Sequence, residues 1–532
     1  MKEEHKLMAN RLKETIDESK LVKKGKRGIH HIIFGRTMLV ILLLLCNFFL
    51  FFSFLLGLFE NLPAFFGSTV AFTAVMLIYV LNTEDSPSVK LSWCILIAIV
   101  PLLGGLLYFY VRFDFGQRLS RRLISDSVRQ SLPFLPEQEE LMEQIKAEDP
   151  DFYNLARYLK NSGNAAVYAN TQVRYFPLGE EKFREMLIQM EKAEKFVFME
   201  YFTIADGYMW DKILDVLRRK VKQGVEVRVM YDGMCAVVNV PYNYPKELEK
   251  MGIQCKMFSP IYPLVSTHYN NRDHRKILVI DGHTAFTGGV NLEDRYINKE
   301  RVYGHWKDTA VMVQGEAAQG FTLMFLQMWN AGERERIYEP YLHPSTSAPA
   351  EGYVIPYGVN PTGTDRVGEM VYLNILNQAK DYVYIMTPYL ILDSEMVTAL
   401  RFAARRGVDV RLILPHIPDK KYAFALARSH YKELIEAGVK IYEYTPGFIH
   451  AKVFLSDDKC GVVGTINLDY RSLYLHYECA AYLYKVPALE DIKADFSATM
   501  AKSQKVTMED VRKRSLLSRF TAALLKVLAP LM

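Results

Sequence analysis

The sequence predicts an α/β protein made of two related halves, preceded by apolar segments that enter a membrane. A pattern of histidine, lysine, aspartate, glycine and asparagine in residues 274–291 returns at the same offsets in residues 450–467. Around each copy, short apolar runs alternate with helical stretches, which is typical of strands that alternate with helices. A chain that carries one motif and one α/β pattern twice is expected to fold as a duplicated domain.

The length and composition set broad limits on the class of protein. A chain of 532 residues with 50% hydrophobic residues is long enough for two domains plus membrane segments. The formal net charge of +5 is mild and identifies no partner. The six cysteines, at positions 46, 94, 235, 255, 460 and 479, lack metal-binding spacing. The sequence therefore implies neither a disulfide framework nor a zinc site.

Three apolar runs precede the α/β region. Residues 37–59 carry no charge and are long enough to span a bilayer, and further apolar runs cover residues 62–81 and 91–111. Buried core helices are the alternative, although such length without a charge is uncommon in soluble cores. We expect two or three transmembrane helices within residues 37–111.

The flanks of these runs bear on their orientation. Basic residues, which mark cytoplasmic flanks, occur on both sides of the apolar region. We expect residues 1–36 to form a basic cytoplasmic arm of a multi-pass protein of the cell membrane, with a cytoplasmic catalytic region. One run is expected to re-enter or to lie in the interface, with Pro63, Pro101 and the Gly104-Gly105 pair as break points.

From about residue 150, each half is predicted to be a strand-helix-strand-helix unit. The first half has expected strands at 195–202 and 224–232 around a helix at 209–223, and the second has strands at 382–386 and 407–414 around a helix at 394–406. We expect a connecting segment at 112–150, a first domain at 151–345 and a second at 346–532, with a linker near 342–352.

The C-terminal segment has its own pattern. Basic and apolar residues at helical spacing from Lys513 to Leu528 predict an amphipathic helix. Such a helix rests on an anionic membrane surface or packs on the protein, and the sequence leaves both open.

Each copy of the motif gathers three polar groups. Residues 275–280 form an apolar strand, so His274 and Lys276 project to the same face. Asp281 and the following glycine predict a hairpin turn. The return strand is expected to bring Gly288 or Gly289 roughly opposite His274, leaving room beside the imidazole, and Asn291 emerges just beyond. An imidazole, an ammonium and a carboxamide are the groups needed to grip and attack a phosphate.

Two copies carry more weight than one. A single His-x-Lys on a strand is usually a half-buried histidine beside a solvated lysine, whereas two copies at identical offsets are hard to obtain by chance. The candidate catalytic residues are His274, Lys276, Asp281, His450, Lys452 and Asp457, and the candidate phosphate ligands are Lys276, Asn291, Lys452 and Asn467. Within this set, the two aspartates are expected to be structural, because turn carboxylates commonly accept backbone N–H bonds.

These motifs resemble those of the phospholipase D superfamily, whose signature is two His-Lys-Asp motifs. The chain is more closely similar to the bacterial cardiolipin synthases, on residues 271–276 in the first half and on Thr387-Pro388-Tyr389 and residues 464–472 in the second. The resemblance implies two pseudo-twofold-related phospholipase D-like α/β sandwich domains. It also implies that His274 and His450 face each other across one phosphate.

The resemblance assigns a role to each group. His274 would be the nucleophile that becomes a phosphohistidine, and His450 the general acid and base. The lysines would neutralise the nonbridging oxygens, and the two asparagines would donate hydrogen bonds to them. In the superfamily an acidic residue beyond the asparagine orients each histidine, and Asp308 and Glu478 are the candidates here. We expect no metal and no other cofactor.

The sequence departs from the family pattern at three places. Asp273 stands where asparagine is usual before the first histidine, and His476 where asparagine is usual two residues before Glu478. Residues 232–235 also differ, because a Gly-Ser pair commonly follows Asp232. His476 adds a second imidazole near the expected site.

The expected function is cardiolipin synthesis: transfer of a phosphatidyl group from one phosphatidylglycerol to another, giving cardiolipin and glycerol. A phospholipase D-type hydrolase, or a phosphatidyltransferase that uses another alcohol such as ethanolamine, is the alternative. A nuclease is disfavoured because 65 Lys+Arg against 60 Asp+Glu do not indicate a basic groove, so no nucleic-acid partner is expected. In a catalytically silent scaffold one motif would be expected to have decayed, and both are intact.

Overall fold

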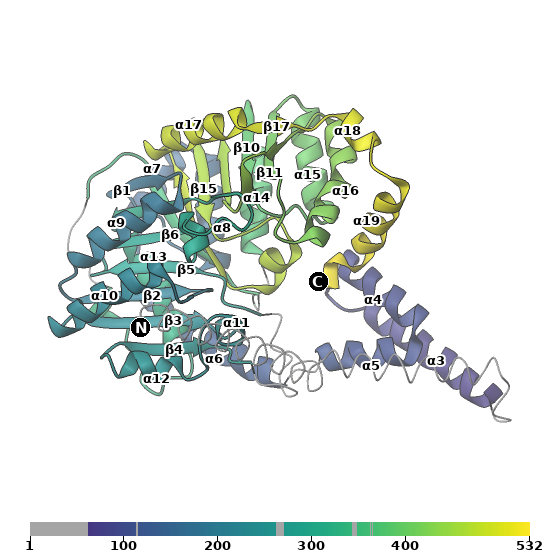
Figure 1. Cartoon of the computed structure of the whole chain (residues 1–532), viewed down its shortest axis with the longest axis horizontal. Coiled ribbons are helices and arrows are strands. Elements are labelled where there is room, and N and C mark those ends of the chain that lie inside the picture. The colour runs from purple at the N-terminus through teal and green to yellow at the C-terminus, as the bar shows by residue number, and fades with distance from the viewer. Residues whose placement is uncertain are drawn as a thin grey trace, which may run out of the picture. The chain divides into compact units, whose positions relative to one another are not determined.

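The computed structural model describes residues 62–112, 115–261, 271–342, 348–361, 363 and 365–531. Its contacts form two units. One holds the described residues up to Gly116 together with residue 261, and the other holds residues 117–260 and 271–531 (Figure 1). The expected basic arm and the first apolar run lie outside the described residues.

The described part of the N-terminal unit contains three helices: α3 (Leu62–Leu81), α4 (Pro87–Ile99) and α5 (Pro101–Arg112). Met76, Val80, Ile97 and Tyr108 form their shared core. The third apolar run is therefore two helices, and Pro101 is the break point, because proline starts a helix readily but cannot continue one. None of the described helices has both the length and the apolar character needed to cross a bilayer.

The larger unit contains two mixed sheets with the same strand order. The first sheet runs β1-β8-β6-β5-β2-β3-β4, and the second runs β9-β16-β15-β14-β10-β11-β12 with β17 added at the edge. In both sheets a parallel strand group, β2-β3-β4 or β10-β11-β12, joins an antiparallel group that begins with the motif hairpin. The duplication read in the sequence is thus a duplication of topology.

The elements of the first half follow the expected order. After α6 (Phe115–Ser131), η1 (Leu132–Phe134), α7 (Glu139–Glu148) and α8 (Pro150–Gly163), they are β1 (Thr171–Phe176), α9 (Gly179–Glu191), β2 (Phe196–Tyr201), α10 (Tyr208–Lys222), β3 (Glu226–Asp232), α11 (Cys235–Val238), α12 (Tyr244–Glu249), β4 (Gln254–Phe258), β5 (Lys276–Ile280), β6 (Thr284–Gly288), η2 (Asp294–Ile297), β7 (His305–Lys307), β8 (Ala310–Gly315), α13 (Ala318–Trp329) and η3 (Glu339–Tyr341).

The second half repeats this order with a C-terminal extension. Its elements are β9 (Tyr353–Val359), α14 (Val367–Gln378), β10 (Tyr382–Met386), α15 (Ser394–Arg405), β11 (Asp409–Pro415), α16 (Lys421–Ala437), β12 (Lys440–Tyr444), β13 (Gly447–Ile449), β14 (Val453–Ser456), β15 (Cys460–Gly464), the π-helical η4 (Arg471–Leu475), β16 (Glu478–Tyr484), α17 (Ala488–Ala501), β17 (Ser503–Lys505), α18 (Met508–Arg512), α19 (Leu516–Leu528) and η5 (Ala529–Leu531). The six strands and helices expected from the repeat are all present, within one or two residues of the predicted ends.

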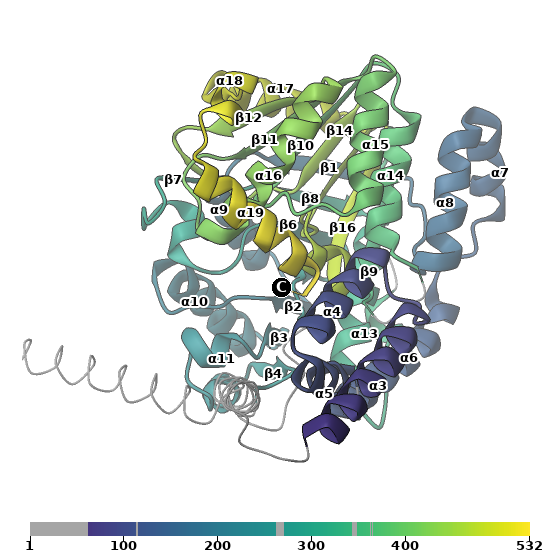
Figure 2. The ribbon, with the colours of Figure 1, turned by 90° about the vertical axis from the view of Figure 1, so that its right-hand side faces the viewer.

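The two sheets share one hydrophobic core. Phe198 and Ile277 of the first sheet and Met386 and Val453 of the second belong to the same buried cluster. On the outer faces, α9 and α10 pack on the first sheet, and α14, α15 and α16 pack on the second (Figures 1 and 2). Contact between the halves is therefore part of the core, and it fixes one half against the other.

The motif aspartates anchor the strand hairpins. Asp281 adopts φ 53° in the turn and accepts hydrogen bonds from the backbone N–H groups of Glu194, Lys195 and Phe196 at 2.8 Å each. Asp457, with φ 54°, does the same for the N–H groups of residues 380–382 at 2.7–3.0 Å. Each carboxylate ties the motif hairpin to the start of its neighbouring strand. Both aspartates lie at the end of the motif strand away from the histidines, in the position expected of turn carboxylates that accept backbone N–H bonds.

This role predicts a loss of stability on substitution. Asp457→Ala removes a charged acceptor from three N–H groups, so we expect the free energy of unfolding to fall by about 2–3 kcal/mol. Chemical unfolding of the detergent-purified chain measures it. Asp381→Ala, an exposed aspartate in the segment that Asp457 holds, is the matched control and should change little. Equal stability of the two variants would contradict the anchoring role.

Candidate active site

The first motif histidine is oriented by an acid from the other half of the chain. His274 Nδ1 lies 2.9 Å from both carboxylate oxygens of Glu478, 204 residues further along the chain. The backbone N–H of His274 donates to the carbonyl of Tyr477 at 2.9 Å, which brings the residue before the acid beside the histidine. Because Nδ1 is occupied, Nε2 is the nitrogen of His274 left for chemistry.

In the second motif, the histidine comes from the second half of the chain and its orienting acid comes from the first half. His450 Nδ1 lies 2.7 Å from Asp308 Oδ2 of the first half. Strands β13 and β7 pair in parallel just before these two residues, and the N–H of His450 donates to the carbonyl of Lys307 at 2.7 Å. The two histidines, at the matching positions of the two halves, are thus each paired with the acid of the opposite half.

The glycines after the motif have a different role from the one expected. The register of β5 and β6 pairs Leu278 with Phe286, which places Gly288 opposite Lys276 rather than His274. A Cβ on Gly289 would lie 2.0 Å from Asp308 Oδ1. The missing side chain therefore makes room for the acid that orients His450. The expectation of open space beside the first imidazole is wrong.

The motif lysines are buried within the site. Lys276 and Lys452 each donate to the backbone carbonyl of their own motif histidine, and Lys452 Nζ also lies 2.9 Å from His450 Nδ1. Burial is the main cause that lowers the pKa of Lys276 to about 8 and that of Lys452 to about 7. Each ammonium keeps N–H donors beyond these bonds, which an anion can accept.

Both motif histidines are held in the neutral form. Burial, and then the positive charges of Lys276 and Lys452, lower the pKa of His274 and of His450 well below the ordinary value. A site with two buried ammonium groups and neutral imidazoles favours an anion, because an anion relieves the unfavourable positive field. A bound phosphodiester would thereby raise the histidine pKa values toward the range needed for acid–base work.

The two asparagines differ in the hydrogen bonds that they make within the described part of the protein. Asn291 Oδ1 accepts from the Thr203 N–H at 3.2 Å, and its Nδ2 donates to the Tyr296 hydroxyl at 2.8 Å. Asn467 Oδ1 is buried and has no hydrogen-bond partner among the described residues. Asn291 therefore keeps one N–H for a ligand, whereas the carboxamide oxygen of Asn467 has no partner in the described part of the protein.

The structure adds residues that sequence reasoning missed. Glu478 also accepts hydrogen bonds from the hydroxyls of Ser472, at 2.7 Å, and Thr465. Both fall within residues 464–472, a stretch that carries the family resemblance, but neither of the two was assigned an individual role. Lys182 of α9 is fully buried with a pKa lowered by burial to about 7, and the nearby Asp308 opposes that shift. In the sequence, Lys182 lies in an ordinary amphipathic helical pattern, which does not mark it as a site residue.

His476 contributes an imidazole without a hydrogen-bond partner. Its ring centroid lies 5.6 Å from that of His274, and its Nδ1 lies 3.8 Å from Glu478 Oε1. Neither buried ring nitrogen has a hydrogen-bond partner among the described residues. Burial lowers its pKa to about 4, so this ring is neutral near physiological pH. His274, His476 and Glu478 have ligand atoms within 4.8 Å of one another, a geometry that fits a metal ion. The nearby ammonium groups of Lys276 and Lys452 oppose a cation there.

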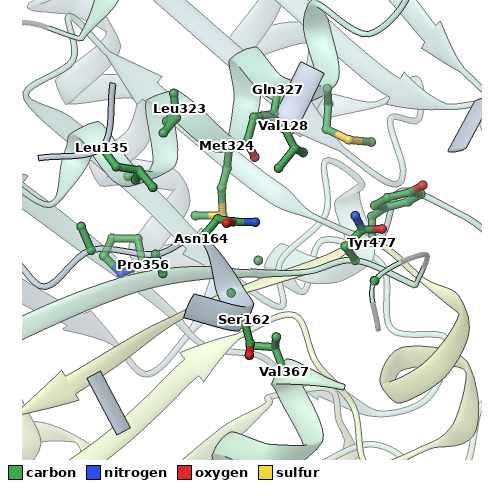
Figure 3. A pocket seen from close by; sticks show the side chains of 18 of the residues that line it. Val128, Leu135, Ser162, Asn164, Leu323, Met324, Gln327, Pro356, Val367 and Tyr477 are labelled. Atoms are coloured by element: carbon green, nitrogen blue, oxygen red, sulfur yellow. The ribbon is translucent and has the colours of Figure 1, made fainter. Parts of the chain in front are cut away.

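A buried pair of carboxyl groups lies behind the first motif. Asp273 and Glu200 are both fully buried, and the guanidinium of Arg275 lies 3.9 Å from Glu200. Arg275 also lines a cavity of about 100 Å³ with Tyr477, Met324, Gln327 and Pro356 (Figure 3). The motif histidines and lysines do not line this cavity. Asp273 therefore belongs to a buried cluster of charged groups adjacent to the first motif.

Comparison with known proteins identifies the family. The model for the cardiolipin synthase, phospholipase D-like domain matches residues 186–329 and 372–500, which include both motifs and both orienting acids. The phospholipase D-nuclease N-terminal model matches residues 71–112. An uncharacterized protein of Streptococcus mutans serotype c is 52% identical over 86% of this chain and 99% of its own length. The cardiolipin synthase of Alkalihalophilus pseudofirmus is 31% identical over 89% of this chain and 94% of its own length.

The fold agrees with a solved structure. The crystal structure of phosphatidylserine synthase from Haemophilus influenzae Rd KW20 matches 71% of this chain and 97% of that chain, with a TM-score of 0.53 at 16% identity. The duplicated α/β fold and its paired motifs define an enzyme of the phospholipase D class. The chain belongs to the cardiolipin synthase family within that class, and it is a phosphatidyltransferase of phospholipid biosynthesis.

The buried acid pair predicts an altered pH dependence of stability. Burial raises the pKa of both Glu200 and Asp273, so the folded chain binds their protons more tightly than the unfolded chain does. Stability contributed by these protons is therefore lost as the pH rises from the unfolded pKa, about 4, through the raised folded values. In Asp273→Asn one of the two ionisations is absent. We expect this variant to lose less stability than the parent chain between pH 4.5 and pH 8.

Unfolding measured at several pH values tests this expectation. Asp381→Asn, which neutralises an exposed carboxyl, serves as the control and should follow the parent curve. A pH dependence for Asp273→Asn that is parallel to the parent would show that the buried pair does not hold its protons in the folded state.

Proposed function

We propose that the chain transfers the phosphatidyl group of one phosphatidylglycerol to the headgroup hydroxyl of a second, through a phosphohistidine on His274. The products are cardiolipin and glycerol. The observation that carries this proposal is the crossed pairing of His274 with Glu478 and of His450 with Asp308, which makes one site from the two halves. Membership of the cardiolipin synthase family supports the choice of substrate.

In the first step, His274 Nε2 attacks the phosphorus of the first lipid. The bond from phosphorus to the headgroup glycerol oxygen breaks, and His450, in the protonated form that the bound anion favours, gives its Nε2 proton to that oxygen, so glycerol leaves. Lys276 and Lys452, together with the remaining N–H groups of Asn291 and Asn467, stabilise the charge that develops on the nonbridging oxygens. Glu478 accepts the Nδ1–H bond of His274 and stabilises the positive charge that its ring acquires.

In the second step, His450 Nε2 takes the proton from the headgroup hydroxyl of the second phosphatidylglycerol. The oxygen attacks phosphorus, the phosphorus–nitrogen bond breaks, and His274 returns to its neutral form. Each step exchanges one bond at phosphorus and moves one proton, so the two histidines are restored after each turnover. Such a division of one displacement into two is the usual advantage of covalent catalysis.

The surroundings of the two histidines support this division of roles. Asp308 and Lys452, the neighbours of His450, have pKa values of about 6 and about 7, in a range where protons exchange near neutral pH. Glu478, the neighbour of His274, is instead fixed by two hydroxyl donors. A histidine that gains and loses a proton in each step fits the first environment, and a nucleophile held in one orientation fits the second.

The proposed location of the enzyme is the cell membrane. The apolar runs before residue 112 would hold the chain there as a multi-pass protein, with the catalytic unit on the cytoplasmic side, and the match to the N-terminal family model over residues 71–112 supports this. The membrane supplies both lipid substrates at high local concentration. This setting favours a lipid hydroxyl over water as the second acceptor.

Product analysis tests the reaction. Purified chain in lipid vesicles with phosphatidylglycerol and no added metal should form cardiolipin and free glycerol. His274→Ala and His450→Ala should each reduce the rate by at least about 10²–10⁴-fold, since each removes a group that acts in both steps. The His274 variant should also fail to retain labelled lipid phosphate after acid-free denaturation.

The other outcomes separate the alternatives. Phosphatidic acid without cardiolipin would replace the synthase proposal with a hydrolase. A different phosphatidyl ester, formed only when ethanolamine is supplied, would indicate another acceptor alcohol. Labelled phosphate retained on the His274→Ala variant but lost from the His450→Ala variant would reverse the assignment of the two histidines.

A further inference from the structure

The C-terminal helix α19 presents an apolar stripe to solvent. Leu516, Leu517, Phe520 and Leu524 are exposed by 81%, 75%, 68% and 56%. Their spacing places all four on one side of the helix. The opposite side of the helix packs on the protein (Figure 2). Leu525, together with Ala529 of η5 just beyond the helix, joins a cluster with Leu426, Tyr470 and Tyr474. The helix is therefore held on the protein by one face, while no described residue covers its other, apolar face.

The charged residues of the C-terminal segment itself are all basic. Residues 511–532 contain Arg512, Lys513, Arg514, Arg519 and Lys526 and no acidic residue. Lys513 pairs with Glu509 at 2.8 Å and Lys526 with Glu433 at 3.3 Å, so two of the five have acidic neighbours outside the segment. Arg519, exposed and on the helix itself, borders the apolar stripe and donates to the carbonyl of Arg512. Exposed leucine and phenylalanine beside unopposed basic groups match an anionic lipid surface.

We propose that α19 docks the catalytic unit on an anionic bilayer, with its apolar stripe inserted at the level of the headgroups. The inference goes beyond the proposed reaction and needs only that the catalytic unit lies beside a membrane. Basic residues then meet lipid phosphates, and the four apolar side chains leave water. An anionic bilayer fits this combination better than a protein partner, because residues 511–532 contain no acidic group to pair with a partner's cation, and the two acids beside them, Glu433 and Glu509, already pair with Lys526 and Lys513.

The helix also contacts the segment that supports Glu478, the acid that orients His274. Tyr470 and Tyr474, against which its C-terminal end packs, enclose Ser472 in the sequence, and Ser472 Oγ donates to Glu478 at 2.7 Å. Glu478 in turn orients His274. The C-terminal end of α19 therefore lies beside the residues that hold Glu478. Docking of α19 on a bilayer would bring lipid phosphates to that side of the catalytic unit.

Tryptophan fluorescence in vesicles tests the docking. Phe520→Trp is introduced into the full chain, with Phe402→Trp as the matched control, because Phe402 is also an exposed phenylalanine, on α15. Both variants carry His274→Ala, so that the phosphatidylglycerol in the vesicles is not consumed. The probe is a vesicle of phosphatidylcholine and phosphatidylglycerol that contains brominated acyl chains, and the signal of the parent chain is subtracted.

We expect brominated lipid to quench the fluorescence gained in Phe520→Trp and to leave that gained in Phe402→Trp unchanged, with the quenching lost in pure phosphatidylcholine vesicles. Equal quenching in the two variants would overturn the proposal. Quenching in Phe520→Trp that does not depend on phosphatidylglycerol would overturn its electrostatic part. A shift of the emission in Phe520→Trp without bromine quenching would indicate that a second copy or another segment of this chain covers the stripe, and would also overturn docking on lipid.

A rate measurement provides a second readout. Leu517→Glu with Phe520→Glu should lower the initial rate on phosphatidylglycerol vesicles by at least about tenfold, since both charges oppose insertion. The rate on dispersed short-chain phosphatidylglycerol in detergent should stay within about twofold, and Phe402→Glu should change neither rate. Equal loss on both substrates would assign α19 a structural role only. If the parent chain forms no cardiolipin, the proposed function fails, and the quenching result still decides the docking.

Discussion

The structure depends on two hydrogen-bonded pairs that cross between its halves. His274 takes its orientation from Glu478, and His450 takes its orientation from Asp308. Neither half holds a complete site, because each supplies one histidine and the acid for the other. The shared core between the sheets is therefore a catalytic requirement as well as a source of stability: a small shift of one sheet against the other would separate both pairs together.

Burial makes this site selective through its charge. Two lysines and two imidazoles are buried close together, and burial lowers the pKa of both Lys276 and Lys452, because their charged forms are unfavourable there. A phosphodiester brings the negative charge that the lysines lack. The same anion makes protonation of a histidine easier, which is what the proposed mechanism requires of the general acid. A neutral lipid headgroup offers neither effect.

Much of this was readable in the sequence, because strand and turn patterns are local. The predicted strands and helices of both halves are present, and so is the alternation that places each histidine and lysine together. The pairing of the acids was not readable: Asp308 and Glu478 stood out as candidates, but contacts across 142 and 204 residues depend on how the halves meet. The role of Gly289 was misread for a different reason: the side chain that occupies the space beside it, Asp308, comes from the connection between β7 and β8 of the same half, and the hairpin pattern does not reveal that contact.

The differences between the halves say more about the chemistry than the symmetry does. Duplication explains why two histidines lie at matching positions, but two equivalent groups would have no reason to take different roles. Here one pair contains a glutamate fixed by Ser472 and Thr465, and the other contains an aspartate beside a lysine that reaches the histidine ring. The fixed pair suits a nucleophile that must keep one orientation while it carries a phosphatidyl group. In the proposed mechanism, the pair with the adjacent ammonium suits the group that gives its proton to the leaving glycerol, because a nearby cation favours loss of that proton.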